Sequence, residues 1–263
     1  MTDTNFTPAP AAPAELGIGA IMGETFSLFG RNFVLFFGLS ATPFLLVFAV
    51  FMMALFPEDI GLGSVDAGRI LIFSTLLGLV TGLLYVLIQG VMARAAVAIK
   101  TGRGPQLGLA VQATLSGFFP ILLLGILYAL AVSLGLILVI VPGLYVMAMF
   151  YVYVPAIVFE RQGFNALGRS AELTKGYRWA VVGVALIVIV IGVLLDITGS
   201  AIVGALDAGN ASGLATTWIS VLMEAVLQGL MAPIGIIASA LVFVRLREIK
   251  DGGSAEDLMS VFE

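Results

Sequence analysis

Two acidic residues lie inside long apolar stretches of this sequence, where a carboxylate is costly. Asp196 comes near the end of an apolar run that begins at Trp179, and Glu224 comes early in a run that begins at Trp218. Because helical residues rise about 1.5 Å each, Asp196 lies about 26 Å from Trp179 and Glu224 about 9 Å from Trp218. A charged side chain at membrane depth costs about 2.5 to 3.5 kcal/mol and usually faces a partner or a water-filled cavity. Asp196 and Glu224 are therefore candidate intramembrane acids.

Two interpretations of these acids are open. If they are neighbours, they would share a proton, because two like charges in a desolvated site cannot both stay ionised at low cost. That arrangement suits a transporter or channel, with Gln89 and Gln228 as further polar groups inside apolar runs. Alternatively, the span that contains Asp196 ends near this residue, and both carboxylates reach the lipid headgroups.

Two missing residue types limit the chemistry of this chain, since none of its 263 residues is His or Cys. Ser-His-Asp and Cys-His pairs, HExxH zinc sites and disulfides are therefore excluded. The remaining residues show no nucleophile paired with a base and no metal cluster. We predict a protein that is not an enzyme and uses no cofactor or metal.

Six long apolar runs position these residues. A helix needs about 20 apolar residues to cross the hydrocarbon core of a bilayer, which is about 30 Å thick. The composition agrees, with 60 % hydrophobic and 11 % charged residues and a mean hydropathy of +1.14. The predicted fold class is all-α, a polytopic membrane protein with six transmembrane helices. The runs are Phe33–Leu55, Ile70–Met92, Phe118–Val141, Gly143–Phe159, Trp179–Asp196 and Trp218–Val244.

Two prolines shape the third and fourth runs. The sequence Val141-Pro142-Gly143 predicts a tight turn between them. Pro155 lies inside the fourth run, where its missing N–H removes one helical hydrogen bond. We therefore expect a bend in that run.

Positive charge is distributed unevenly over the connections between the runs. Of the twelve Lys and Arg, only Arg69 lies in the connections at 57–69, 142 and 206–217. By the positive-inside rule, both termini and the segments 94–117 and 161–178 are cytoplasmic. The predicted location is the cell inner membrane, multi-pass, with Asp196 and Glu224 in its outer third. We expect membrane lipids as partners and no nucleic acid.

Three segments between the runs have the pattern of amphipathic helices at a membrane interface. They cover residues 18–31, 107–117 and 163–178, and each precedes a pair of runs. We predict three repeats of an interfacial helix plus a helical hairpin, at 17–98, 105–160 and 163–250, within one membrane domain spanning 17–250. The alternative is that any helix near a membrane surface looks amphipathic. Residues 1–16 are predicted to be a disordered tail and 251–263 a short cytoplasmic tail.

One segment carries a family resemblance. The sequence PAIVFERQGFNALGRS at 155–170, continuing through LTKG at 173–176 to Trp179, resembles the hallmark of the membrane domain family of glycerophosphoryl diester phosphodiesterases. The ends, ETFSLFGRNF at 24–33 and VRLREIKDG at 244–252, are similar to the ends of that family. The resemblance covers nearly the whole chain after the tail. It implies a six-helix bacterial inner-membrane module whose biochemical role is mostly unassigned.

The same resemblance argues against phosphodiesterase activity. The catalytic domain of those enzymes uses histidine and metal-binding carboxylates. This chain has no histidine and no room for that domain. We therefore expect a stand-alone membrane domain without the catalytic one.

The basic residues after the fourth run form a candidate lipid or partner surface: Arg161, Arg169, Lys175 and Arg178. Each would contribute about 1 kcal/mol beside anionic headgroups. Control of membrane topology explains the same charges.

The second run carries small residues at fourfold spacing, Ser74, Gly78 and Gly82. Such a stripe lets two helices approach closely. We expect packing there, within the bundle or between copies in a homo-oligomer.

These observations favour a noncatalytic membrane module that organises lipids or partner proteins at the cytoplasmic face. The alternative is a small transporter or channel for an ion or small solute that uses Asp196 and Glu224.

Overall fold

The computed structural model of the 263-residue chain describes residues 15–55, 67–208 and 214–252. These residues form helices joined by short connections, and no strand occurs among them. The elements in chain order are α1 (Ile18–Arg31), α2 (Phe33–Leu55), α3 (Ala67–Lys100), α4 (Leu107–Ser116), α5 (Phe118–Leu138), α6 (Ile140–Met149), α7 (Tyr153–Glu160), η1 (Gly163–Asn165), α8 (Ala166–Thr174), α9 (Arg178–Ala208) and α10 (Leu214–Asp251).

The described helices have the length and composition of a polytopic membrane protein, which confirms the predicted fold class. Within the described residues, 5 stretches are long and apolar enough to cross a membrane, and the pair α1 and α2, bent by 84°, makes a sixth if it counts as one broken span. The five stretches are Ser74–Lys100, Phe118–Leu138, Ile140–Glu160, Arg178–Leu206 and Leu222–Asp251.

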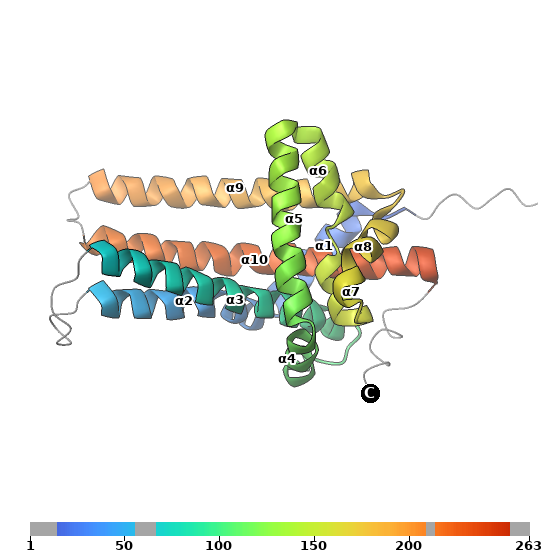
Figure 1. The fold of residues 1–263 in the computed structure, drawn as a ribbon, viewed down its shortest axis with the longest axis horizontal. Helices are drawn as coiled ribbons and strands as arrows, with labels where there is room; N and C mark the ends of the chain where they lie inside the picture. The colour runs from blue at the N-terminus through green and yellow to red at the C-terminus, as the bar shows by residue number, and fades with distance from the viewer. Residues whose placement is uncertain (1–14, 56–66, 209–213, 253–263) are drawn as a thin grey trace, which may run out of the picture.

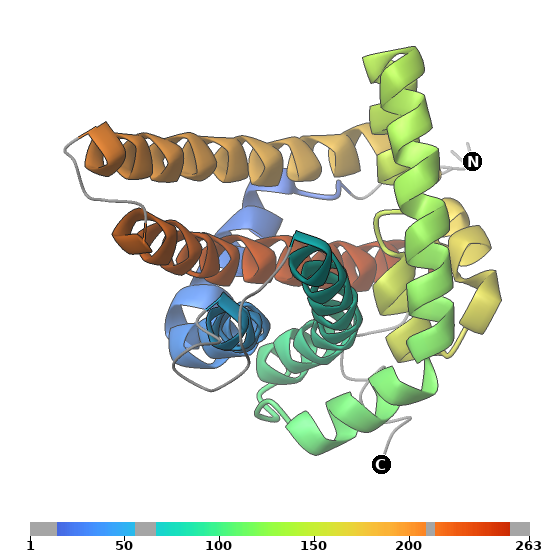
Figure 2. The same cartoon turned by 60° about the vertical axis from the view of Figure 1, so that its left-hand side comes forward.

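Four long helices, α2, α3, α9 and α10, run side by side, as Figures 1 and 2 show. Helix α10 contacts the other three and also α1, α7 and α8. In the most apolar 18-residue stretch of α10, 61 % of the residues are buried, against 11 % in the corresponding stretch of α5. Helix α10 is therefore the central element of the bundle.

The hairpin of α5 and α6 lies across the four long helices and not alongside them (Figure 1). The α5–α6 turn therefore does not lie at the end of the bundle where α2 and α9 end. The charge pattern, by contrast, places the connections that follow α2, α5 and α9 on one side of the membrane. Helix α5 is apolar around its whole circumference, although only one side, with Ile121 and Leu124, is buried, so its sequence has no single stripe that would fix it parallel to a neighbour. The exposed apolar residues of the hairpin include Phe119, Leu123, Ile126, Leu130, Leu134, Ile137 and Leu138.

The hairpin turns three residues earlier than expected. Val139 adopts an extended conformation between α5 and α6, and Pro142 and Gly143 already belong to the first turns of α6. A Cβ atom at Gly135 would lie 2.8 Å from the Gly143 Cα atom. This close backbone contact explains why the two helices can reverse direction within a single residue.

The fourth run is broken next to Pro155, as expected. Helix α6 ends at Met149 and α7 begins at Tyr153, so the run consists of two helices. Pro155 has no N–H to donate to the carbonyl of Tyr151, four residues earlier. The break leaves backbone groups that another element must satisfy.

The apolar face of α1 packs on protein. Ile21, Met22, Leu28 and Phe29 are buried, and α1 contacts α9 and α10. Leu16 is 3 % exposed and joins the same core, so the packed domain includes the end of the predicted tail 1–16. Residues 1–14 and 253–263 lie outside the described residues.

The element order contains a short helix and a hairpin three times: α1 with α2 and α3, α4 with α5 and α6–α7, and α8 with α9 and α10. The first and third hairpins lie side by side, while the second lies across them (Figure 2). The three repeats at 17–98, 105–160 and 163–250 stay a prediction.

Candidate functional site

Helix α8 docks on the break between α6 and α7. The Ser170 hydroxyl donates to the Met149 carbonyl at 2.9 Å and accepts from the backbone N–H of Val152 at 3.3 Å. Thr174 donates to the same carbonyl at 3.2 Å, and both side chains are buried. The hydroxyls of α8 thus satisfy the backbone groups that the break exposes.

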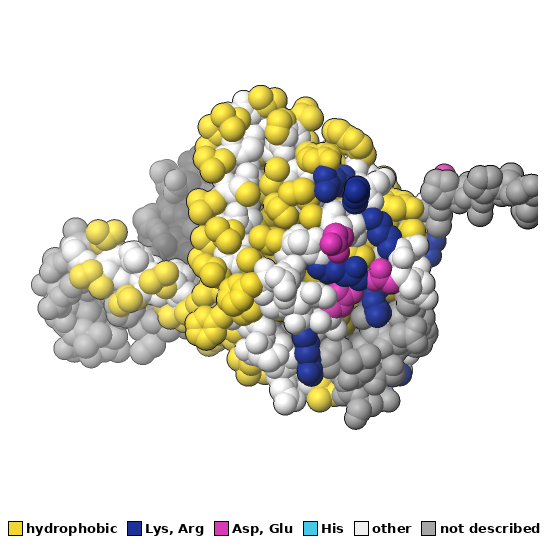
Figure 3. All heavy atoms as spheres, turned by 45° about the vertical axis from the view of Figure 1, so that its right-hand side comes forward, with side chains coloured by type: hydrophobic (Ala, Val, Ile, Leu, Met, Phe, Trp, Pro, Cys, Tyr) yellow, Lys and Arg dark blue, Asp and Glu magenta, His cyan; other side chains and the backbone are white. Residues whose placement is uncertain are grey.

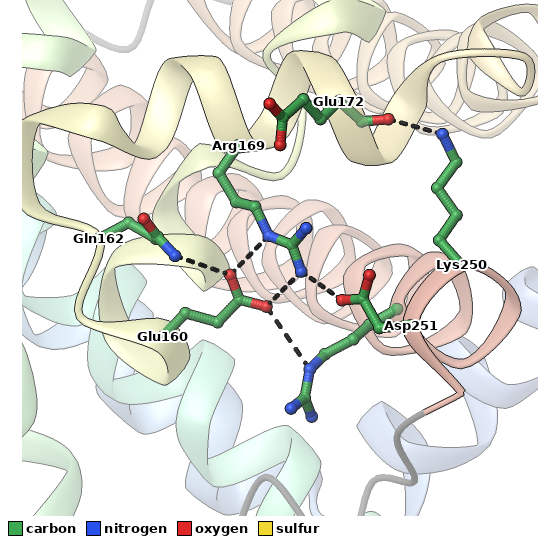
Figure 4. Close-up of polar contacts among 7 residues, drawn as sticks. Glu160, Gln162, Arg169, Glu172, Lys250 and Asp251 are labelled. Atoms are coloured by element: carbon green, nitrogen blue, oxygen red, sulfur yellow. Dashed lines mark hydrogen bonds and ion pairs between the residues drawn. The ribbon is translucent and has the colours of Figure 1, made fainter.

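A cluster of four charged side chains ties α8 to the ends of α7 and α10 (Figure 4). Arg169 donates from Nε to Glu160 Oε2 at 2.7 Å and from Nη2 to Glu160 Oε1 at 2.9 Å. It also donates to Asp251, while Arg247 Nε lies 3.5 Å from Glu160 Oε1. We call Glu160, Arg169, Arg247 and Asp251 the charged cluster. Its two acids and two bases balance in charge.

Glu160 is the centre of this cluster, because Arg169 and Arg247 both pair with its carboxylate. Its side chain is only 11 % exposed. It also accepts a hydrogen bond from Gln162 Nε2 at 3.3 Å. The hydrogen bonds to Glu160 raise the pKa of the Arg169 guanidinium above its usual value, and burial only partly opposes this effect. Bidentate arginine and carboxylate pairs of this kind fix orientation as well as charge.

Lys250 closes the other end of α8. Its Nζ donates to the backbone carbonyls of Glu172 at 2.6 Å and Lys175 at 2.8 Å. These carbonyls lie at the C-terminus of α8, where a cation is favoured by the helix dipole. The last turn of α10 therefore contacts α8 in two places. Asp251 bonds Arg169 of the charged cluster, and Lys250 bonds the carbonyls at the C-terminus of α8.

An open hollow of about 710 Å³ lies beside the charged cluster. Its wall includes the cluster itself and polar groups of Gln162, Asn165 and Glu172. The side chain of Phe164, 59 % exposed, also borders it. Figure 3 shows basic and acidic side chains interleaved on this face, beside an apolar surface.

The four basic residues expected to form one surface have different surroundings. Arg169 belongs to the charged cluster, and Arg178 donates to the Tyr145 hydroxyl with its guanidinium 4.7 Å from the centre of that ring. Arg161 and Lys175 are exposed. The face is thus of mixed charge, and its accessible basic groups are fewer than the sequence indicates.

Aromatic residues accompany the basic ones on this face. Trp179 is 64 % exposed, and its ring centre lies 6.5 Å from that of Tyr145. Tyr145, Arg178 and Trp179 therefore form a continuous group next to Lys175, which we call the aromatic–basic patch. Aromatic and basic side chains together are typical of membrane interfaces.

The two candidate intramembrane acids lie on neighbouring helices, α9 and α10, and Gln228 hydrogen-bonds one of them, Glu224. Asp196 and Gln228 line one groove of about 350 Å³ between α9 and α10. Gln228 Nε2 donates to Glu224 Oε1 at 2.9 Å. Among the described residues no direct bond joins Asp196 to Glu224. Helix α9 continues to Ala208, beyond Asp196, and both interpretations of these acids stay predictions.

A second, larger cavity of about 610 Å³ lies between the α5–α6 hairpin and helices α3, α9 and α10. Its wall contains Gln89 and Gln228 but neither Asp196 nor Glu224, and none of the described residues lining it carries a charge. It adjoins the Asp196 groove, because Ile189, Gln228 and Met231 line both. We call this space the central cavity. A pathway that passes Asp196 would have to use the groove, while Glu224 lines neither space.

The small-residue stripe of α3 has no helix packed on it among the residues that the structure describes. A Cβ atom at Gly78 or Gly82 would meet nothing within 4 Å, and Ser74 is exposed. Packing within the bundle is therefore not seen at this stripe, and packing between copies stays a prediction.

Close helix contacts occur at other glycines, which sequence reasoning missed. A Cβ atom at Gly229 would lie 2.7 Å from the Phe37 ring, and one at Gly199 would lie 2.6 Å from the Leu227 side chain. Ser40 donates to the Gly229 carbonyl at 3.0 Å, which joins α2 to α10 inside the core. Gly229 follows Ala225 at the fourfold spacing of small residues, whereas Gly199 has no such neighbour, so spacing alone does not single out these contacts and the fold reveals them.

The described residues contain no group of three or more Asp and Glu that could hold a metal ion. Comparison of the chain with family models, with curated proteins and with solved structures finds no match.

Proposed function

We propose that this protein is a noncatalytic module of the bacterial inner membrane that organises anionic lipids at its charged, cytoplasmic end. The observation that carries the proposal is the aromatic–basic patch next to Lys175, where exposed aromatic rings flank cations. Tryptophan and tyrosine favour the headgroup level, and Lys and Arg there attract anionic lipids.

The fixed position of α8 supports this proposal. Ser170, Thr174, the charged cluster and Lys250 hold the helix on three other elements. Arg161 and Lys175 precede and follow this helix and are exposed. Headgroups would thus meet two cations whose separation is set by a rigid helix, an arrangement that favours binding because little order has to be created.

The resemblance to the phosphodiesterase membrane domain family belongs to the same proposal. In the resembling segment, Glu160 and Arg169 pair with each other, and Ser170 satisfies the helix break. These contacts give a structural reason for three residues of the segment, and they involve no chemical step. The segment is therefore suited to building the lipid-facing end.

The experiment compares lipids retained by the purified protein. Wild type and the double variant Arg161→Gln/Lys175→Gln are reconstituted in nanodiscs of phosphatidylcholine and phosphatidylglycerol, released into detergent, and measured by native mass spectrometry. The ratio of retained phosphatidylglycerol to phosphatidylcholine is expected to fall about fivefold for each charge removed, from about 1 kcal/mol per cation. The control variant Arg161→Lys/Lys175→Arg keeps the wild-type ratio. An unchanged ratio in the Gln variant would refute the proposal.

One observation favours the transporter or channel as a second candidate. The groove that Asp196 lines adjoins the central cavity through Gln228, so polar groups continue from one space to the other. Uptake of a cation into proteoliposomes that depends on Asp196 would establish this function instead.

A further inference from the structure

The wall of the central cavity has two kinds of surface. The side formed by α9 and α10 is mostly apolar, with Ala185, Val188, Met231 and Ile236, and carries polar groups only at Gln228 and Ser239. The side formed by α3, α5 and the α6–α7 break carries phenol rings, among them Tyr128, Tyr151 and Tyr153. Mostly apolar walls with a few polar groups, and a volume between about 300 and 1,000 Å³, are typical of sites that bind small molecules. The cavity has about 610 Å³.

The cavity is elongated along α10. Its wall includes Gln228 at one end and Ser239 at the other, eleven residues along a single helix. At about 1.5 Å per residue this is about 16 Å. Half of the hydrocarbon core of a bilayer is about 15 Å. The cavity therefore has the length of the acyl region of one leaflet.

Three hydroxyl groups on the phenol side have no partner in the described part of the chain. Tyr128 and Tyr153 pack ring to ring at 5.6 Å, yet neither hydroxyl, nor that of Tyr151, hydrogen-bonds a described residue. A tyrosine hydroxyl removed from water usually has a partner. An ester carbonyl is an acceptor that uncharged donors can satisfy, whereas a phosphate in this cavity would meet no cation.

The cavity can be reached from the lipid side of the bundle. Ile126 of α5 and Ile189 of α9 both line it and are 50 % and 42 % exposed. Because the hairpin lies across α9 and α10, it covers the cavity from one side without closing it against the surface. A chain from the surrounding bilayer can enter between these helices without crossing a polar barrier.

We infer that the central cavity binds one acyl chain of a membrane glycerolipid, with the ester group at the tyrosine hydroxyls. This site is separate from the aromatic–basic patch and recognises the chain and the ester, not the charge of the headgroup. The inference therefore does not rest on the proposed function, and either can fail alone.

The test uses phosphatidylcholine that carries a photoreactive diazirine in the middle of one acyl chain. The full-length protein is reconstituted in phosphatidylcholine vesicles with this lipid, irradiated and analysed by peptide mass spectrometry. In wild type, crosslinks are expected at Tyr128, Met147 and Met231, which line the cavity, in addition to the outer face of α5. Crosslinks on the outer face alone would overturn the inference.

The variant Ala129→Phe fills the cavity, because Ala129 lines it and is exposed on the rim. Crosslinks to cavity residues should fall about tenfold or more, since ring and chain cannot occupy the same volume. The matched control is Leu130→Phe, the next residue of α5, which is 55 % exposed and does not line the cavity. Equal cavity crosslinking in both variants would also overturn the inference.

Two further variants keep the test decisive if Ala129→Phe does not fold. Ile189→Phe fills the cavity from the opposite wall and should give the same loss. Tyr151→Phe removes one hydroxyl and keeps the ring, so cavity crosslinking should fall about fivefold, as for one net hydrogen bond. Tyr145→Phe, outside the cavity, should change nothing there. A Tyr151→Phe protein that crosslinks like wild type would exclude the ester contact at this hydroxyl.

Discussion

The charged end and the central cavity of this bundle solve opposite problems. At the charged end, polar contacts join α7, α8 and α10. The side chains that bond a group on another helix there are Glu160, Arg169, Asp251 and Lys250. In the middle, the helices α3, α5, α9 and α10 leave a space of about 610 Å³ between them. This fold is therefore fixed through polar contacts at one end, while open space remains in its apolar middle.

The largest effect is expected at Glu160. Glu160→Gln removes the charge that two guanidinium groups share in a place with only 11 % exposure. We expect a loss of about 2 to 3 kcal/mol in the free energy of unfolding, because charged hydrogen bonds are lost and two cations keep incomplete pairing. Thermal unfolding in detergent, followed by circular dichroism, measures it. Glu172→Gln, an exposed acid of the same helix region, is the control. Equal stability of the two variants would show that the charged end is not fixed by this cluster.

Two glycines of α10 lie in differently packed places, Gly229 in the tight core and Gly235 at the central cavity. Gly229→Ala places a Cβ atom 2.7 Å from the Phe37 ring, so we expect a loss of about 1 to 3 kcal/mol from overpacking. Gly235→Ala faces the cavity, where the nearest atom is 3.6 Å away on Val188, and should gain up to about 1 kcal/mol from helix propensity. The same unfolding assay compares them. If Gly235→Ala is as destabilising as Gly229→Ala, the middle is as tightly packed as the core.

A smaller effect is expected at Lys250. Lys250→Met keeps the length of the side chain and removes the cation that binds the α8 carbonyls at 2.6 and 2.8 Å. The expected loss is about 0.3 to 1 kcal/mol. Hydrogen exchange should show faster exchange confined to α8 and the residues that follow it. Lys175→Met, which removes an exposed cation nearby, should leave that exchange unchanged. Equal exchange rates in α8 of wild type and Lys250→Met would contradict the assigned role.

The smallest effect is expected at the intramembrane acids. Asp196 and Glu224 are exposed on the helix surface, so Asp196→Asn and Glu224→Gln should change stability by less than about 0.5 kcal/mol. Cation flux into proteoliposomes should equal that of protein-free vesicles for wild type and both variants. A wild-type cation flux that Asp196→Asn abolishes would show instead that the groove lined by Asp196 is the functional region.

Much of the fold was predictable from apolar length alone. The start of α2 at Phe33 and of α5 at Phe118, and the break beside Pro155, agree with the expectations. The orientation of the α5–α6 hairpin was not predictable. Helix α5 is apolar on every side, so its sequence does not specify which face meets the bundle.

The candidate site was predictable only in part. The segment around Arg169 was identified from its charge, but its partner Asp251 is 82 residues away, and a charge pattern does not show such a pair. The glycine stripe at Gly78 predicted helix packing that the described part of the bundle does not use, while Gly229, which follows Ala225 at the same fourfold spacing, does pack closely. Contacts of this kind depend on which faces meet, and the hydrophobic period does not determine this.

The central position of α10 has a consequence for biosynthesis. Helices α1, α2, α3 and α9 are all made before α10, and each of them contacts it. Until α10 is inserted, the surfaces that it covers must face lipid or the insertion machinery, so the earlier helices cannot reach their final packing in the order of synthesis. Completion of this bundle is therefore a late, post-insertion event, and until then the surfaces of α1, α2, α3 and α9 that α10 later covers depend on their surroundings.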